Sequence, residues 1–404
     1  MLQKAIVEDK RDHPSREWIE ALRRDYPTEA EFDRMLTRKM LRRMEPSRPG
    51  RYSMPELDQA LRRFLDAKLQ GPYEISDMRW LMGGASKIQL AFTLDWSEAG
   101  VAQHQRLVMR MEPEESLNST SRLREQQIFT FFRDILPVPK VFWLDEDGTW
   151  LPQAAIIYEW LPGVSTPSRK ERRVAGIGQS FPPELRQKLG PQFLEALVRI
   201  HTADYRQGDL SAFQVPAENS TESALLHLNR VLRIWEEDRG FEFPVFDLAV
   251  SWLRHNLPVL DRPSILHGDF RAGNFLFDEA TGQITAWLDF ERGYIGDRHR
   301  DLAWTTLSSY GNLAEDGKTF LVSGLVPLDE FLSSYERLSG LSIDPARLKY
   351  YRVFNSLQNV LAALASAWRV VRLGKTHQDV LVAMLEGIGH AQADEICCLL
   401  EEDF

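Results

Sequence analysis

Apolar and polar residues alternate between residues 88 and 96, where Ile, Leu, Phe, Leu and Trp are separated by Gln, Ala, Thr and Asp. This period of two predicts a half-buried β-strand, and Gly83 and Gly84 just before it predict a hairpin turn. The same region holds three more predicted elements: short apolar strands at Leu107–Met111 and Ala154–Tyr158, and a helix at Ser121–Asp134. Residues 71–162 are therefore predicted to form a small lobe of strands with one prominent helix, here called the N-lobe.

Helical spacing dominates beyond residue 184. Helices are predicted at Leu185–His201, Leu225–Glu237 and Arg347–Arg372. The apolar face of the last one comprises Tyr351, Phe354, Leu357, Leu361, Leu364 and Trp368. Two short apolar strands, Phe275–Phe277 and Ile284–Leu288, interrupt the helical part and are joined by a turn. Residues 163–404 are therefore predicted to form a second, mostly helical part, here called the C-lobe.

Residues 1–70 are charged and helix-rich, and they differ in character from the rest of the chain. The stretch Arg34–Arg51 carries seven basic residues against Glu45 alone. The simplest interpretation is a solvated helix face, and the alternative is a docking surface for an anionic partner or substrate. We expect residues 1–70 to form a helical extension that nucleotide binding does not require.

The overall composition limits which classes of partner and which cellular location we expect. The chain has 404 residues, a formal net charge of −10 and a pI of about 5.5, whereas a general nucleic-acid binder is more often basic. No apolar run approaches the ~18 residues of a membrane span, and the first residues show no secretory pattern. The two cysteines, Cys397 and Cys398, are neighbours and cannot form a disulfide framework. We therefore expect a cytoplasmic protein without a nucleic-acid partner or a membrane span, and the oligomeric state stays open.

Polar residues stand at the ends of the hairpin predicted around residues 275–288. Asp269 and Asn274 precede it, and Asp289 follows it directly. A carboxylate, an amide and a second carboxylate are hard oxygen donors of the kind that Mg²⁺ prefers. Zinc would instead require His or Cys ligands, and His267 is the single such residue nearby.

The spacing of these residues resembles a kinase catalytic loop. Asp269 and Asn274 are five apart, as are the catalytic Asp and the metal-binding Asn of protein kinases. The loop reads His267-Gly268-Asp269, and it is followed by Leu288-Asp289-Phe290-Glu291, Gly296-Asp297 and Asp301-Leu302-Ala303. This series resembles the aminoglycoside phosphotransferase and choline kinase superfamily over about residues 75–310. The string from His267 to Asn274 further resembles kinase domains that are fused to acyl-CoA dehydrogenases.

The resemblance implies an α+β, protein-kinase-like two-lobed fold, with an antiparallel-sheet N-lobe, a mostly helical C-lobe and the N-terminal helical extension. It implies that Asp269 is the catalytic residue and that Asn274 and Asp289 bind magnesium. The nucleotide, ATP with GTP not excluded, would be held by Gly83, Gly84, Ala85, Ser86, Arg110, Glu125, Glu159, Trp160 and Leu161. Of these residues, Gly83–Ser86 cover the phosphates and Arg110 pairs with Glu125. Glu159–Gly163 form the hinge that meets the adenine.

The implied function is ATP- and magnesium-dependent phosphorylation of a hydroxyl group on a small molecule. The acceptor is either a hydroxyacyl-CoA or another hydroxylated metabolite, or an aminoglycoside-like antibiotic. Because Arg110 stands where relatives often carry Lys, a catalytically inactive nucleotide-binding scaffold is the alternative. His201, His267, Asp297 and Asp301 are predicted to have structural roles, and the role of Glu291 is left open.

Overall fold

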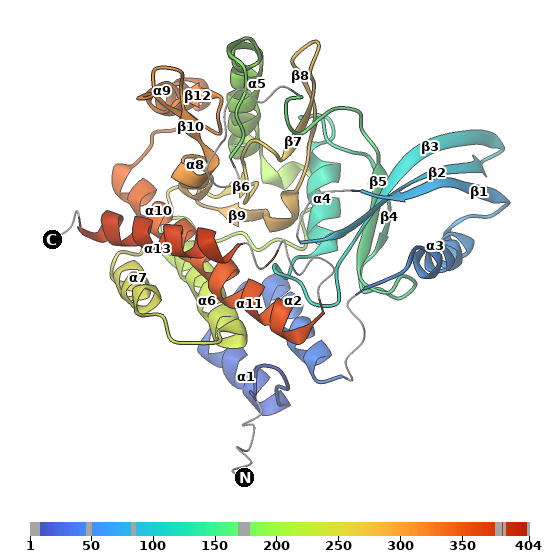
Figure 1. Ribbon diagram of the computed structural model, residues 1–404, viewed down its shortest axis with the longest axis horizontal. Helices are drawn as coiled ribbons and strands as arrows, with labels where there is room; N and C mark the ends of the chain where they lie inside the picture. The colour runs from blue at the N-terminus through green and yellow to red at the C-terminus, as the bar shows by residue number, and fades with distance from the viewer. Residues whose placement is uncertain are drawn as a thin grey trace.

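A five-stranded antiparallel sheet forms one side of the molecule in the computed structural model, which describes residues 9–45, 51–81, 86–168, 178–375, 382 and 385–401 (Figure 1). The strand order is β1-β2-β3-β5-β4. The strands are β1 (Tyr73–Trp80), β2 (Ile88–Glu98), β3 (Val101–Met111), β4 (Val141–Asp145) and β5 (Ala155–Glu159). The alternating stretch at residues 88–96 is thus a central strand, as predicted, and it pairs with β3 along its whole length.

Two helices cover opposite faces of this sheet. Alternate residues of β3, such as Leu107 and Met109, pack with α3 (Met54–Lys68). Val108, between them, packs instead with α4 (Arg122–Phe132), which Ser121 caps. Because successive side chains of a strand point to opposite faces, Arg110 lies on the α4 side together with Val108.

The packing of α3 bears on the domain division that we expected. Leu57, Leu61 and Phe64 are fully buried against the sheet, so α3 belongs to the core of the N-lobe. A chain that starts at residue 71 would lack this helix and expose the apolar face beneath it. Dispensability of residues 1–70 does not fit this packing, and we propose that the N-lobe begins between α2 (Ala30–Arg43) and α3.

The C-lobe is mostly helical and holds several short strand pairs (Figure 1). Its helices are α5 (Pro183–Thr202), α6 (Glu222–Asp238), α7 (Pro244–His255), α8 (His299–Thr305), α9 (Leu328–Ser339), α10 (Pro345–Leu361), α11 (Ala367–Leu373) and α13 (Glu386–Glu401). Its strands are β6 (Ser264–Leu266), β7 (Phe275–Asp278), β8 (Gln283–Trp287), β9 (Tyr294–Gly296), β10 (Asn312–Leu313), β11 (Phe320–Val322) and β12 (Val326–Pro327). β7 pairs with β8 and β6 pairs with β9, so the predicted hairpin is present.

The long helix predicted at Arg347–Arg372 is interrupted by a π-helical turn at Ala362–Ser366, between α10 and α11. Five of the six predicted inward residues are buried, but Trp368 is 37% exposed. A π turn adds one residue to the helical cycle, which rotates every later side chain away from the 3.6-residue pattern. The prediction for Trp368 is therefore wrong, and its neighbour Arg369 is buried instead.

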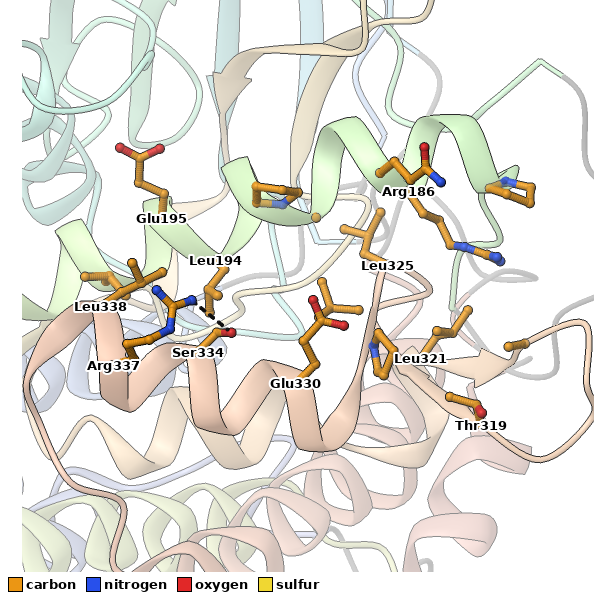
Figure 2. A pocket seen from close by; sticks show the side chains of 18 of the residues that line it. Arg186, Leu194, Glu195, Thr319, Leu321, Leu325, Glu330, Ser334, Arg337 and Leu338 are labelled. Carbon is orange, nitrogen blue, oxygen red and sulfur yellow. Dashed lines mark hydrogen bonds between the residues drawn. The ribbon is translucent and has the colours of Figure 1, made fainter.

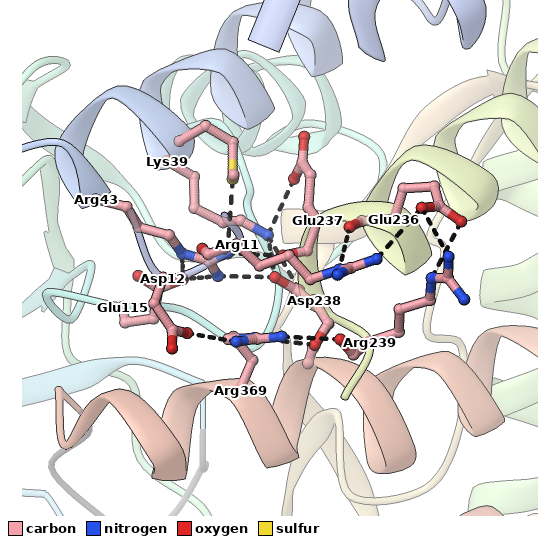
Figure 3. Close-up of polar contacts among 12 residues, drawn as sticks. Arg11, Asp12, Lys39, Arg43, Glu115, Glu236, Glu237, Asp238, Arg239 and Arg369 are labelled. Carbon is pink, nitrogen blue, oxygen red and sulfur yellow. Dashed lines mark hydrogen bonds and ion pairs between the residues drawn. The ribbon is translucent and has the colours of Figure 1, made fainter. Parts of the chain in front are cut away.

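The first helices, α1 (Arg16–Asp25) and α2 (Ala30–Arg43), lie beside α6 (Figure 1). Figure 3 shows Lys39 and Arg43 of α2 directed at Asp238, at the end of α6. Lys39 Nζ lies 3.0 Å and Arg43 Nη2 2.7 Å from Asp238 Oδ1, and all three side chains are buried. Arg43 also pairs with Glu115, which follows β3. Part of the basic stretch at 34–51 is therefore neither a solvated face nor a docking surface, because it joins the two lobes internally.

The buried pairs of Asp238 predict a large cost for removing its charge. Asp238→Asn would remove the carboxylate that Lys39 and Arg43 share and leave them with Glu237 and Glu115 alone, and breaking a buried ion pair in this way typically costs about 3–5 kcal/mol. The free energy of unfolding, measured by urea titration, should fall by this amount. Asp147→Asn is the matched control, because Asp147 pairs with Arg34 and Arg38 but is 60% exposed, and its loss should cost at most about 1 kcal/mol. Equal costs for the two variants would contradict the prediction.

The same comparison has a defined pH dependence. Burial opposes the ionisation of Asp238, but Lys39 and Arg43 outweigh it and hold the pKa of Asp238 well below its usual value. A lowered folded-state pKa contributes stability that is complete above the unfolded pKa of about 4 and is lost as the pH falls toward the folded value. The difference between the parent and Asp238→Asn should therefore be full at neutral pH and shrink in strong acid.

Candidate active site

The loop from His267 to Asn274 connects β6 to β7 and is held by Asp301 of α8. The buried carboxylate of Asp301 accepts the backbone N–H of His267 at 2.7 Å and that of Gly268 at 3.0 Å. His267 Nδ1 accepts the N–H of Asp269 at 3.2 Å, and Nε2 donates to the carbonyl of Leu288 at 2.9 Å. His267 and Asp301 thus brace the loop and fix the direction in which Asp269 points.

Gly268 is required by a close backbone approach. Its φ is +81°, and a Cβ built there would lie 2.3 Å from the carbonyl oxygen of Arg292. Any other residue would therefore force apart two backbones as well as adopt a left-handed conformation. This contact explains why the loop needs Gly at this position, and it packs the Asp269 loop directly on the segment that follows Asp289.

Asp269 is held by two donors on one oxygen. Its Oδ1 accepts Trp304 Nε1 at 2.7 Å and Arg271 Nε at 3.0 Å. Burial favours the neutral acid, but the charges of Arg271 and Arg292 outweigh it and lower the pKa of Asp269 below its usual value. Asp269 is therefore an ionised, oriented carboxylate at neutral pH, with its second oxygen available to a substrate hydroxyl.

Asn274 and Asp289 are brought together by the hairpin. Asn274 Nδ2 donates to the backbone carbonyl of Asp269 at 2.7 Å, which leaves the amide oxygen as the atom that can face a cation. The carbonyl of Asn274 accepts the N–H of Leu288 at 2.9 Å, so the residue before Asp289 is tied to the loop. Asp289 adopts φ +62°, a region that Asp tolerates better than most residues, and its side chain is 36% exposed.

This donor pair fits magnesium. Among the described residues, no group of three or more His, Cys, Asp or Glu is arranged to hold a metal. A cation at Asn274 and Asp289 would therefore take its remaining ligands from phosphate oxygens and water, as Mg²⁺ usually does and zinc does not.

Arg110 lies behind Asp289 in a buried set of charges. Its guanidinium is 3.2 Å from Glu125 Oε1 and 2.9 Å from Glu291 Oε2, and it also contacts Asp289 Oδ1. The structure pairs Arg110 with Glu125, as the resemblance implies, and it also brings Arg110 to Asp289, which the resemblance does not specify. Burial raises the pKa of Glu125, although Arg122 and Arg110 lie beside it.

Four residues of this buried set were not among the predicted site residues: Lys87, Glu112, Arg122 and Glu291. Lys87 Nζ lies 3.2 Å from Glu112 Oε2 and 3.3 Å from Glu291 Oε2. Arg122 Nη2 lies 3.1 Å from Glu291 Oε2. Glu291, whose role we left open, is therefore a buried hub, and the surrounding cations lower its pKa against the effect of burial. A lysine next to the predicted Gly turn was the one local signal that pointed to this set.

The predicted nucleotide-covering turn lies between β1 and β2. Gly83, Gly84 and Ala85 fall outside the described residues. Ser86 is described, and its hydroxyl donates to Glu291 Oε1 at 3.2 Å. The end of this turn is therefore joined to the same charge set that contacts Asp289.

The predicted hinge follows β5. The N–H of Glu159 donates to the carbonyl of Lys140 at 2.8 Å, and that of Trp160 donates to the carbonyl of Arg106 at 3.0 Å. Within the part of the chain that the structure describes, the N–H of Leu161 has no backbone partner. Among the amides of Glu159, Trp160 and Leu161, that of Leu161 is thus the one available to a nucleotide base.

A family model described as the phosphotransferase enzyme family matches residues 94–351, which include every predicted catalytic and metal-binding residue. The chain belongs to this phosphotransferase family. The enzyme class predicted from the sequence, a small-molecule kinase, is confirmed at this level.

Solved structures of aminoglycoside phosphotransferases share the fold. A protein of Ralstonia eutropha JMP134 assigned to these enzymes matches with a TM-score of 0.61 and 18% identity, over 85% of this chain and 98% of that one. The ternary complex of APH(4)-Ia with ADP and hygromycin B matches with a TM-score of 0.51 and 15% identity, over 84% of this chain and 98% of that one. The predicted α+β, kinase-like two-lobed fold is therefore confirmed.

Curated relatives are acyl-CoA dehydrogenase family proteins. Acyl-CoA dehydrogenase family member 10 of Mus musculus is 24% identical over 65% of this chain and 23% of its own length. The Arabidopsis thaliana protein "Probable acyl-CoA dehydrogenase IBR3" is 25% identical over 65% of this chain and 33% of its own length. The chain thus spans a quarter to a third of these relatives. Among the described residues, no helix is both long and apolar enough to cross a bilayer.

A separate groove of about 980 Å³ lies in the C-lobe between α5 and α9 (Figure 2). Its floor is apolar, with Leu194, Leu321 and Leu325, and its rim carries charges such as Arg186 and Glu330. None of the residues predicted for the site lines this groove. The groove is therefore distinct from the arrangement around Asp269.

The contacts of Arg110 predict how its replacements behave. Arg110→Ala would leave Glu125, Asp289 and Glu291 without their shared cation, so MgATP should bind at least tenfold more weakly. Arg110→Lys keeps one charge near Glu125 and Asp289 and should retain most of the affinity. Calorimetric titration with MgATP measures both, and thermal melting shows whether each variant is folded. Unchanged affinity in folded Arg110→Ala would show that Arg110 does not hold the nucleotide.

Proposed function

We propose that this chain is an ATP- and magnesium-dependent kinase that transfers the γ-phosphoryl group to a hydroxyl of a small molecule. The observation that carries the proposal is the convergence of Asp269, Asn274 and Asp289 on one hairpin, with the Arg110–Glu125 pair buried behind it. These are the groups that phosphoryl transfer needs for positioning and for charge neutralisation.

Each residue of the proposed mechanism has a defined task. Asp269 accepts a hydrogen bond from the acceptor hydroxyl and orients its oxygen toward the γ-phosphorus. It receives the hydroxyl proton as the new oxygen–phosphorus bond forms and the bond from the γ-phosphorus to the bridging oxygen breaks, which releases ADP. Arg110 keeps Asp289 and Glu125 in place, and Leu161 offers its N–H to the base. Asn274 and Asp289 would hold the magnesium ion, which neutralises phosphate charge when bound.

The surroundings of Asp269 favour an acceptor that is not a polycation. Arg271 touches Asp269, and the charge of Arg292 acts on it. An aminoglycoside would bring several positive charges against these arginines and be repelled. The names of the curated relatives point to CoA thioesters, so a hydroxyacyl-CoA or another hydroxylated metabolite is the proposed acceptor class.

A panel of acceptors tests the function. ADP release is followed in a coupled assay with hydroxyacyl-CoAs, free hydroxy acids and kanamycin, each with and without Mg²⁺. Magnesium-dependent ADP formation that requires one non-cationic acceptor supports the proposal, and Asp269→Asn provides the background. The alternative is an inactive nucleotide-binding scaffold, because Arg110 stands where relatives often carry Lys. A scaffold should bind MgATP tightly but release no ADP in response to any acceptor.

A further inference from the structure

Arg292, whose charge acts on Asp269, and the buried Arg230 of α6 differ from the other buried arginines that the structure describes. Arg43, Arg122, Arg233, Arg347 and Arg369 each pair with at least one carboxylate. Arg230 and Arg292 pair with none among the described residues. The Nε atoms of both are buried and have no hydrogen-bond partner there. Asp269 acts on Arg292 and Glu29 on Arg230 without forming an ion pair, and a buried cation that lacks a direct partner is costly unless a ligand or another contact stabilises it.

Aromatic rings supply part of that contact. The guanidinium of Arg292 lies 4.4 Å from the ring centroid of Trp304, and that of Arg230 lies 3.6 Å from the ring of Phe32. Stacking on a ring orients a guanidinium and leaves its edge free to bind an anion in the plane. Arg292 is partly exposed, so its edge can be reached from solvent.

The two side chains belong to a larger positive region. Arg300 lies 5.4 Å from the ring of Trp304 and donates to the carbonyl of Gly268 at 2.7 Å. Burial, reinforced by the charge of Arg292, lowers the pKa of Arg230 to about 9. Burial and the charge of Arg300 likewise lower the pKa of Arg292. Mutual repulsion of this kind is relieved when an anion binds between the cations.

The region adjoins the proposed reacting group. Trp304, on which Arg292 stacks, donates its Nε1 to Asp269 at 2.7 Å. The backbone of Arg292 also touches Gly268, the residue before Asp269. A compact acceptor could therefore place its hydroxyl at Asp269 and its anionic group at Arg292 at the same time.

We propose that Arg292, with Arg230 behind it, binds an anionic group of the acceptor, either a carboxylate or a phosphate, and so selects anionic hydroxyl compounds. That the bound anion belongs to a phosphoryl acceptor rests on the proposed kinase function. The existence of the anion site does not depend on that function. Arg292 is then a specificity-determining residue, and Arg230 supports its charge from α6.

The test measures binding without turnover. The protein is first saturated with magnesium and a non-hydrolysable ATP analogue, so that probe anions cannot occupy the nucleotide site. The probes are 3-hydroxybutyrate, 3-hydroxybutyryl-CoA, inorganic phosphate and the uncharged 3-hydroxybutyramide, titrated by calorimetry. Binding of the free acid but not of the thioester indicates a carboxylate site, and preference for the thioester and phosphate indicates a phosphate site.

The variants are Arg292→Gln, Arg292→Lys and Arg230→Gln, with Arg199→Gln as the control. Arg199 is 51% exposed, pairs with Glu195 and lies in the separate groove. We expect Arg292→Gln to weaken the best anionic probe about 10–100-fold, Arg292→Lys to keep part of the affinity, and Arg199→Gln to change nothing. The amide should bind the parent at least tenfold more weakly than the best anionic probe.

Two binding results would overturn the inference: anionic probes that bind Arg292→Gln as well as the parent, or a parent that binds no anion better than the amide. A failure of the kinase proposal looks different, because it leaves anion binding intact and removes only acceptor-dependent ADP release. Conversely, turnover on a neutral or cationic acceptor that Arg292→Gln does not alter would keep the kinase and exclude the anion site.

Discussion

Asp269→Asn is expected to lower turnover by about 10²–10⁴-fold while MgATP binds nearly as well as in the parent. The amide oxygen can still accept Trp304 Nε1 and Arg271 Nε, so the side chain should keep its orientation. The variant loses the negative charge and the basicity that receive the hydroxyl proton. A loss of this kind lowers kcat with little change in KM, since the ground-state contacts remain.

The measurement pairs a calorimetric MgATP titration with turnover on whichever acceptor the panel identifies. Asp209→Asn, at an exposed aspartate that caps a local turn, serves as the control and should match the parent. A variant Asp269→Asn that fails to bind MgATP would move Asp269 into the metal site. One that retains full turnover would remove it from the chemistry.

Loss of the Asp289 carboxylate is expected to abolish turnover in a protein that remains folded. Asp289 is the proposed metal ligand whose side chain reaches solvent, and it also contacts Arg110. Its φ of +62° makes Asp289→Ala a mixed test, because alanine in the left-handed region adds about 1–2 kcal/mol of backbone strain. Asp289→Asn tolerates that conformation better and keeps the shape, so it isolates the charge.

Both Asp289 variants are compared by titrating Mg²⁺ against the rate and by thermal melting. The asparagine variant should melt close to the parent, the alanine variant should melt lower, and both should lack magnesium-dependent turnover. Activity that persists in either variant with an unchanged magnesium requirement would contradict the assignment of Asp289.

The elements that the sequence predicts well are those that neighbouring residues determine. The strand at Ile88–Glu98 and the helix at Arg122–Phe132 follow from periodicity and from a Ser N-cap. The approach of Asp269 to Asn274 follows from a short loop. The predicted inward position of Trp368 is wrong because a π turn five residues long leaves no clear mark in the apolar pattern.

The charge set behind Asp289 was harder to predict because it depends on tertiary packing. Lys87, Glu112 and Arg122 lie far from Glu291 in sequence, and each alone resembles a surface charge. The basic stretch of α2 was likewise interpreted from charge alone, whereas its partner Asp238 lies on α6. Sequence patterns report which residues are polar, and they do not report which polar residues meet after the lobes have packed.

The ion pairs between α2 and α6 also determine when α2 can reach its final position during synthesis. Lys39 and Asp238 are 199 residues apart, and ribosomes add about 5–20 residues per second. Lys39 is therefore made about 10–40 s before the carboxylate that neutralises it exists. During that interval the cations of α2 have to stay in contact with water. Charged side chains favour this state, whereas apolar side chains at the same positions would not. A helix that is made early can thus be fastened only after α6 has been made, and mutations of Asp238 should affect the yield of folded protein in cells more than its position at the end of α6 suggests.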